Sequence, residues 1–313
     1  MAMTTLAMTT MGRMRFLDPV VKLAYRLRGR RYRHLRYYVS GYCVTQVPHG
    51  YRVMVNECEY LFDSINALVN TRSSAVDSIA IVASGPSLAN VDLTAHWGTH
   101  RFLTVNGSHR IYSGEQSVFD YYLVNDIGFI RRQWESFLRG VAVSKTILVD
   151  HRVLYEVLQR DANALEGKVV VLFDLSTRPY GKPLDDCQHQ PDRGVYTSDD
   201  TGDKAVFSIN PDYAFAPGGT VAYLALQLVV AMGFGRVLFF GLDLNGGGRF
   251  YTQQNNEKSM LEQDYKSLIE PHFKLARAAC DELGVTLYNA SQVSRLPEKI
   301  IPRCDFNAFY GDA

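Results

Sequence analysis

Small polar residues stand where short apolar runs of the sequence end. Ser84-Gly85-Pro86-Ser87 follows one run, Asn106-Gly107-Ser108 a second, Asn125-Asp126 a third and Gly241-Leu242-Asp243 a fourth, while Gly218-Gly219-Thr220 precedes a long apolar stretch. Hydroxyl, amide and glycine N–H groups bind phosphate well, because they donate hydrogen bonds and glycine lets an anion approach the backbone. As a set, these five segments predict a site for a nucleotide-type ligand.

Two residues are candidate general bases. His272 stands at the start of an apolar helical pattern and has a side chain that titrates near neutral pH, while Asp126 is a carboxylate at a predicted strand end. His109 is the reserve candidate. A purely structural role is the alternative for two of the residues named so far. His272 would then be a packed residue at a helix start, and Asp243 would cap a neighbouring loop.

Apolar runs of strand length alternate with helical patterns from about residue 78 onward. Strands are predicted at 78–83, 101–105, 120–124, 145–149, 168–173, 236–242 and 285–288, and helices at 130–138, 152–159, 218–232 and 260–283. This alternation predicts an α/β, Rossmann-like fold with a mostly parallel sheet and helices on both faces. The carboxyl ends of such strands share one edge of the sheet, where ligands bind.

The chain divides into two predicted parts. Residues 1–75 form a basic N-terminal arm and an irregular lead-in, and residues 76–313 form a single nucleotide-binding domain. Within that domain, residues 174–217 are rich in Pro, Asp, Gly and Ser and interrupt the alternation. A long stretch of this kind predicts a lid-like insertion, the alternative being an ordinary surface insertion.

The charge of the chain is concentrated at one end. Lys and Arg total 33 against 32 Asp and Glu, but residues 13–36 hold nine Lys or Arg and only Asp18 among acids. Together with its Tyr and Leu residues, this arm suits the surface of an anionic membrane, the alternative being a solvated basic helix. No recognised nucleic-acid module follows it, so we expect no nucleic-acid partner.

Cysteine usage and the absence of several motifs narrow the chemistry. The five cysteines are widely spaced without a Cys-x-x-Cys pair, which favours a cytoplasmic location and excludes a disulfide scaffold. Neither a Gly-x-Gly-x-x-Gly nor a P-loop pattern occurs, and no Asp-x-Asp pair is available for a metal diphosphate. We expect a donor with one phosphate, no cofactor and no required metal.

Five motifs in order carry a resemblance to bacterial CMP-sugar glycosyltransferases. They are Ile81-Val-Ala-Ser-Gly-Pro-Ser-Leu88, Val105-Asn-Gly-Ser108, Gly219-Thr220 opening an apolar helix, Gly241-Leu-Asp243 and Arg249-Phe-Tyr251. The set most resembles the lipopolysaccharide-core Kdo (3-deoxy-manno-octulosonic acid) transferases that add a third Kdo. It is more distantly similar to the family 42 sialyltransferases. The resemblance covers residues 78–302.

The resemblance implies roles for individual residues. Gly85, Pro86 and Ser87 match the loop that holds the nucleotide, Asn106 matches an asparagine beside the donor, and Thr220 falls at the start of the buried helix. Tyr251 matches a tyrosine that bonds the leaving phosphate, whereas Asn245 stands in the place of a second such tyrosine. For the carboxylate of the donor sugar, the candidates are Arg131, Arg132 and Arg249.

The function implied is a metal-independent, inverting transfer of Kdo from CMP-Kdo to a lipopolysaccharide core or related glycolipid. The acceptor is expected at the inner face of the cytoplasmic membrane, which makes the protein cytoplasmic or peripheral. Two alternatives stand beside this: a sialyltransferase that uses a CMP-sialic or other nonulosonic acid, and a non-catalytic accessory protein that retains the nucleotide pocket.

Overall fold

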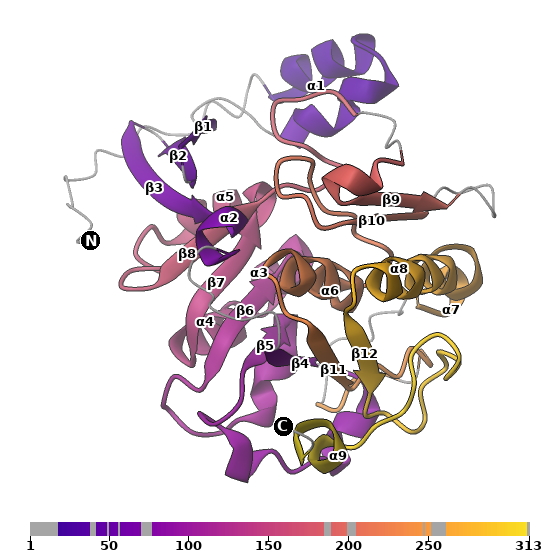
Figure 1. Ribbon diagram of the computed structural model, residues 1–313. Helices are drawn as coiled ribbons and strands as arrows, with labels where there is room; N and C mark the ends of the chain where they lie inside the picture. The colour runs from indigo at the N-terminus through magenta and orange to yellow at the C-terminus, as the bar shows by residue number, and fades with distance from the viewer. Residues whose placement is uncertain are drawn as a thin grey trace.

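The computed structural model describes residues 18–37, 42–48, 50–55, 57–69, 77–184, 189–198, 205–246, 248–251 and 261–311. Ten strands of this part form one sheet in the order β1-β2-β3-β8-β7-β6-β5-β4-β11-β12 (Figure 1). Within it, seven of the nine strand pairs are parallel. The predicted α/β fold with a mostly parallel sheet is therefore confirmed.

The parallel strands coincide with the predicted apolar runs. They are β4 (Ser78–Val82), β5 (Phe102–Val105), β6 (Phe119–Val124), β7 (Ser144–Asp150), β8 (Val169–Phe173), β11 (Arg236–Phe240) and β12 (Thr286–Asn289). Alternate residues of a strand face opposite sides of the sheet, and in β4 Ile79 and Ile81 pack in one cluster with α6 (Val221–Ala231), whereas Ala80 and Val82 pack in another. Both faces are thus buried.

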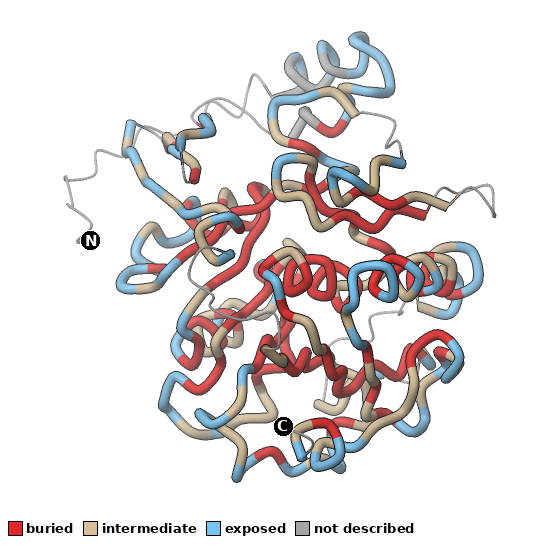
Figure 2. The backbone as a smooth tube through the Cα atoms, in the orientation of Figure 1, coloured by how far each residue is buried: buried red, intermediate tan, exposed pale blue. Residues whose placement is uncertain are grey.

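Helices cover both faces of the sheet. On one face lie α6 and α8 (Glu270–Glu282), and on the other α3 (Ile127–Arg132), α4 (Trp134–Ala142) and α5 (His151–Arg160). The shorter helices are α2 (Ile65–Val69), α7 (Leu261–Asp264), a π-helical turn (Tyr265–Ile269) and α9 (Phe306–Gly311). Figure 2 shows α6 buried along almost its whole length, in keeping with a sequence that is apolar except for Gln227.

The predicted irregular lead-in is wrong for residues 42–64. They form β1 (Tyr42–Val47), β2 (Gly50–Val55) and β3 (Cys58–Ser64), an antiparallel extension of the sheet that joins it through β8. Val53 and Val55 of β2 are buried in the cluster that includes α5. These strands continue the same sheet as the strands after residue 77.

The insertion predicted at 174–217 has regular structure where the structure describes it, and its role as a lid stays a prediction. It contains a hairpin of β9 (Val195–Ser198) and β10 (Ala205–Ser208), which packs on α6 and α8. The Tyr223 hydroxyl donates to the Val206 carbonyl at 2.7 Å, and the buried Gln227 side chain accepts from the amides of Ser208 and Ala216 at 2.9 and 3.0 Å. Buried contacts of this kind hold the insertion in one place.

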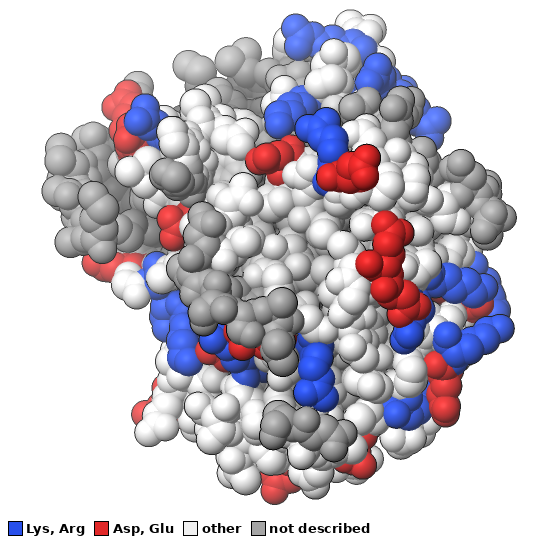
Figure 3. Space-filling view, viewed as in Figure 1, with Lys and Arg blue, Asp and Glu red and all other residues white. Residues whose placement is uncertain are grey.

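The described part of the basic arm forms helix α1 (Asp18–Leu27) and the 3₁₀ helix η2 (Arg30–Tyr37); residues 13–17 lie outside the described residues. Figure 3 shows Lys and Arg gathered at the end of the molecule where α1 lies. Among the helices that the structure describes, none is both long enough and apolar enough to cross a membrane.

Candidate functional site

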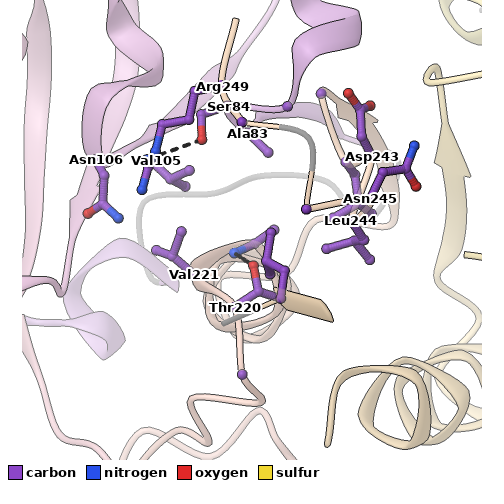
Figure 4. Close-up of a pocket in the computed structure, with 18 of the residues that line it drawn as sticks. Ala83, Ser84, Val105, Asn106, Thr220, Val221, Asp243, Leu244, Asn245 and Arg249 are labelled. Atoms are coloured by element: carbon purple, nitrogen blue, oxygen red, sulfur yellow. Dashed lines mark hydrogen bonds between the residues drawn. The ribbon is translucent and has the colours of Figure 1, made fainter. Parts of the chain in front are cut away.

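A pocket of about 490 Å³ lies at the carboxyl ends of β4, β5, β6 and β11, beside the start of α6 (Figure 4). Ten of the predicted site residues line it: Ser84, Gly85, Pro86, Asn106, Asn125, Asp126, Gly219, Thr220, Asp243 and Arg249. These residues come from separate segments of the chain, and the parallel sheet brings them together because its strands end at a common edge.

The N-terminus of α6 points into this pocket. Thr220 is the capping residue, and its Oγ1 accepts a hydrogen bond from the Ala222 amide at 3.4 Å. Gly218 and Gly219 adopt φ angles of 52° and 77°, which only glycine adopts readily. Within the described chain the Val221 amide has no acceptor. An unpaired amide at the positive end of a helix dipole favours an anion.

Asn106 carries the clearest sign of a missing partner. It begins the 3₁₀ helix η5 (Asn106–Ile111) directly after β5, with a φ angle of 45°. The residue is 7% exposed, and its side-chain Oδ1 is buried without a hydrogen-bond partner among the described residues. Buried polar atoms are nearly always paired, so the Asn106 amide is not fully satisfied by the described chain; Figure 4 shows its nitrogen on the pocket side, where it can donate to a ligand.

Asp243 and Ser87 hold the pocket's floor together. The Asp243 carboxylate accepts hydrogen bonds from the Ser87 amide at 2.7 Å, from the Ser87 hydroxyl at 2.5 Å and from the Ser291 hydroxyl. Gly85 lies so close to the backbone of Gly241 that a Cβ atom at residue 85 would be 2.5 Å from the Gly241 carbonyl oxygen. The loop-capping alternative for Asp243 is therefore the one that the structure supports. Ser87, predicted to hold the nucleotide, bonds this carboxylate and does not line the pocket.

Arg249 brings a positive charge to the opposite wall. Its guanidinium donates to the Ser84 hydroxyl at 3.3 Å and to the Tyr251 hydroxyl at 3.1 Å, and Figure 4 shows it between Ser84 and Asn106. Both described acceptors of Arg249 are neutral hydroxyls, and among the described residues no carboxylate forms an ion pair with it. This charge is available to an anionic ligand.

Tyr251 lies at the margin of the site and does not line it. Its hydroxyl packs against Gly107, where a Cβ atom would lie 2.2 Å from the phenolic oxygen, and its ring is covered by the Arg110 guanidinium at 4.4 Å. Arg110 is not among the predicted site residues, although its position two residues after Ser108 could have indicated that it lies near the site. It donates only to the neutral Ser136 and Gln133 side chains in the described chain.

Asp126 is the other carboxylate of the pocket. It caps α3, where its Oδ1 accepts from the Gly128 amide at 2.8 Å, and its Oδ2 lies 3.9 Å from Arg132. Its side chain is 44% exposed, so a substrate hydroxyl can reach it. Arg131 faces elsewhere, because it pairs with Glu156 through two bonds of 3.0 and 2.8 Å.

The structure does not bring His272 to the pocket. Its ring packs edge-on against Tyr223 at 5.1 Å, and its Nδ1 lies 2.7 Å from the Leu268 carbonyl oxygen. Burial lowers the pKa of His272, since the charged imidazole loses its hydration. Its side chain fits the structural alternative, that of a packed helix-start residue.

Three other predicted residues support the pocket from outside. Ser108 donates to the Val82 carbonyl at 2.5 Å and accepts from the Val105 amide at 2.8 Å, which joins the ends of β4 and β5. Gly107 and Gly218 give room to neighbouring tyrosine rings. The reserve base His109 is buried beneath, 3.0 Å from the Asn106 carbonyl oxygen, and burial lowers its pKa to about 4.

Several lining residues were given no role from the sequence, although Asn245 was recognised as standing in the place of a tyrosine. The far wall contains Leu244, which has a φ angle of 59°, and Asn245, whose Nδ2 donates to the Val293 carbonyl at 2.7 Å. Apolar lining comes from Val105, Val221 and Leu261. Sequence carries little signal for such residues, because apolar side chains occur throughout the core. In the described part of the chain, no group of three His, Cys, Asp or Glu side chains is placed to hold a metal ion.

Comparison with known proteins shows the family of the chain. The model of the family described as "3-deoxy-D-manno-octulosonic acid transferase WaaZ" matches residues 62–307. The chain belongs to this family of Kdo transferases. The predicted recognition and the predicted enzyme class, a glycosyltransferase, are thereby confirmed.

Relatives and solved structures resemble the chain over most of its length. A probable 3-deoxy-manno-octulosonic acid transferase of Salmonella typhimurium strain LT2 is 24% identical over 64% of this chain and 77% of its own. One of Escherichia coli strain K12 is 22% identical over 72% and 82%. The sialyltransferase CstII from Campylobacter jejuni, in complex with cytidine-5'-monophosphate, is 12% identical over 74% and 87%, with a TM-score of 0.42. The sialyltransferase Cst-I from the same organism is 12% identical over 74% and 82%, with a TM-score of 0.42.

Proposed function

We propose that this Kdo transferase moves Kdo from CMP-Kdo to a lipopolysaccharide core or related glycolipid at the inner face of the cytoplasmic membrane. Inversion of configuration and independence of metal ions are parts of the same proposal. One observation carries it: the positive end of α6 and the guanidinium of Arg249 line a single pocket. CMP-Kdo bears two anions, a phosphate and a sugar carboxylate, which match these two features.

The donor fits the pocket with its phosphate at one end and its sugar carboxylate at the other. Its phosphate lies at the N-terminus of α6, where Thr220 and the unpaired Val221 amide donate. Its sugar carboxylate lies at Arg249, because guanidinium groups bind carboxylates through two parallel bonds. Arg131 pairs with Glu156 and Arg132 faces Asp126, so of the three predicted arginines Arg249 suits this role best.

The reaction exchanges one C–O bond for another. The bond from the anomeric carbon to the phosphate oxygen breaks, and its electron pair leaves with CMP, while the acceptor hydroxyl oxygen bonds to the same carbon from the opposite face. The helix terminus stabilises the charge that develops on the phosphate. The acceptor proton passes to Asp126, since the oxygens of Asp243 are occupied by Ser87 and Ser291.

Donor competition tests the proposal against its alternatives. Purified protein is incubated with a Kdo-terminated lipid acceptor and either CMP-Kdo or CMP-sialic acid, each with and without EDTA, and the anomeric configuration of the product is read by NMR. Transfer from CMP-Kdo with inversion and with an unchanged rate in EDTA is expected. Transfer from CMP-sialic acid alone would identify a sialyltransferase, and CMP binding without any turnover would identify an accessory protein.

A further inference from the structure

Helix α1 presents an apolar stripe that no described part of the chain covers. Val20, Leu23 and Leu27 are 62, 56 and 80% exposed. Successive residues of a helix are turned by about 100°, so these three side chains lie within an arc of roughly 60°. Exposed apolar side chains are common singly, but a row of them on one face of a helix marks a contact surface.

Basic residues flank the stripe on both sides. On the same helical wheel Arg26 lies beside Leu23, and Arg28, just past the end of α1, lies beyond Val20 on the other side. Arg30 and Arg33 of η2 are also exposed, and residues 19–36 contain no Asp or Glu. The face is therefore an apolar strip between two cationic margins.

Hydrogen bonds to the main body hold η2, the segment that follows α1, in place. The Arg31 carbonyl accepts from the Leu184 amide at 2.9 Å, and the Arg31 Nε donates to the Leu184 carbonyl at 2.8 Å. His34 Nε2 lies 2.9 Å from the Pro179 carbonyl oxygen. With η2 tied to residues 179–184, α1 lies at the outer edge of the molecule (Figures 1 and 2).

We propose that this face docks α1 in the plane of an anionic lipid bilayer. The leucine and valine side chains enter the boundary of the acyl region, and the flanking arginines bind lipid phosphates. A second copy of the chain is a poorer occupant, because pairing two such faces brings their arginines together without an acidic partner. Three apolar side chains also fall short of the about 1,000 Å² that a stable protein interface buries. The docking does not depend on the identity of the donor.

Vesicle sedimentation of the full chain tests the docking. The vesicles are of phosphatidylcholine, alone or with phosphatidylglycerol, and the double variant Leu23→Ser, Leu27→Ser is compared with Leu61→Ser, Val169→Ser, which alters exposed apolar residues on β3 and β8. The first pair is expected to lower partitioning onto anionic vesicles by about tenfold or more. The second pair should bind as the parent does.

Charge variants separate the electrostatic contribution. Arg26→Gln with Arg30→Gln is expected to lower partitioning by roughly 25-fold, about fivefold for each charge. Arg52→Gln with Lys299→Gln removes the same charge from exposed positions elsewhere and should leave it unchanged. Because all these residues lie outside the pocket, the release of CMP from donor without vesicles should persist in every variant. Failure of the docking is thereby distinguishable from failure of the proposed reaction.

Two results would overturn the proposal. One is equal partitioning of the parent and the Leu23→Ser, Leu27→Ser protein, or of the parent onto neutral and anionic vesicles. The other is a dimer in light scattering that this variant abolishes, which would assign the stripe to a second copy of the chain.

Discussion

The Asp243 carboxylate accepts hydrogen bonds from both the amide and the hydroxyl of Ser87, 156 residues earlier in the chain, at 2.7 and 2.5 Å. This pair ties the end of β11 to the loop after β4. The floor of the pocket therefore depends on the buried Asp243 carboxylate. Its described hydrogen-bond partners, Ser87 and Ser291, do not line the pocket. Removal of the Asp243 carboxylate should lower the stability of the fold, and the reaction should be affected only as a consequence of that loss.

Asp243→Ala is expected to lower the free energy of unfolding by about 3 kcal/mol, since it leaves the part-buried Ser87 amide and the buried Ser291 hydroxyl without an acceptor. Ser87→Ala removes one hydrogen bond and should lower it by about 1 kcal/mol. Urea unfolding measures both. Asp126→Ala is the matched control at an exposed helix cap, with an expected loss of about 1 kcal/mol. Equal losses for the two aspartates would contradict the structural role of Asp243.

Asn106→Gly and Asn106→Ala separate ligand binding from backbone strain. Both variants lack the amide and should bind CMP about tenfold or more weakly, the loss expected for a hydrogen bond to a charged or polar ligand group. Only Asn106→Ala should also lower the free energy of unfolding, by about 1 kcal/mol, because alanine adopts a φ angle of 45° less readily than glycine. Calorimetric titration and thermal unfolding check the two effects. Parental CMP affinity in Asn106→Gly would remove Asn106 from the donor site.

Arg249→Gln should weaken binding of the intact donor more than that of CMP. If the guanidinium pairs with the sugar carboxylate, its loss costs about 2 kcal/mol for CMP-Kdo, roughly 30-fold in Kd, and little for CMP alone. Competition titration with the two ligands measures the difference. Arg131→Gln, on a surface ion pair with Glu156, should change neither. An equal effect on both ligands would instead place Arg249 at the phosphate.

Stability should fall on acidification, because buried histidines, among them His109 and His151, stay neutral in the folded state. Burial lowers the pKa of His109 to about 4 and that of His151 to about 3, from 6.5. As the pH falls below 6.5, the unfolded chain takes up protons that the folded chain does not, so stability is lost between pH 6.5 and 4. Asp174, whose pKa burial raises to about 6, acts in the opposite direction over the same range.

The two histidines outweigh the one aspartate, and the net loss between pH 7 and 4 should be on the order of 3 kcal/mol. Urea unfolding at pH 7, 6, 5 and 4 gives the slope. His109→Gln is expected to flatten it by removing one of the two titrations. A stability that rises towards pH 4 would show that Asp174 dominates.

The parallel strands are predictable because each is a short apolar run that is buried on both faces. In β3 half-buried and exposed positions alternate and none is buried, in β2 only Gly50, Val53 and Val55 are buried, and polar residues such as Arg52 and Glu59 interrupt the run. Their place in the sheet depends on pairing with each other and with β8, which local composition does not reveal. The insertion at 174–217 is loop-like in composition, yet one buried glutamine, Gln227, holds it on α6.

The sequence by itself determines that polar and glycine residues follow the strands, because strand lengths and helix starts can be recognised from local patterns. A parallel sheet then brings these residues together at one edge. Only the tertiary structure decides which of them face the pocket. Ser87 and Asp243 satisfy each other, Asn106 keeps an unpaired oxygen, and His272 turns into the core. The reason is physical: a buried polar group takes whatever partner the packing brings within hydrogen-bond distance, and in this chain such partners come from distant segments.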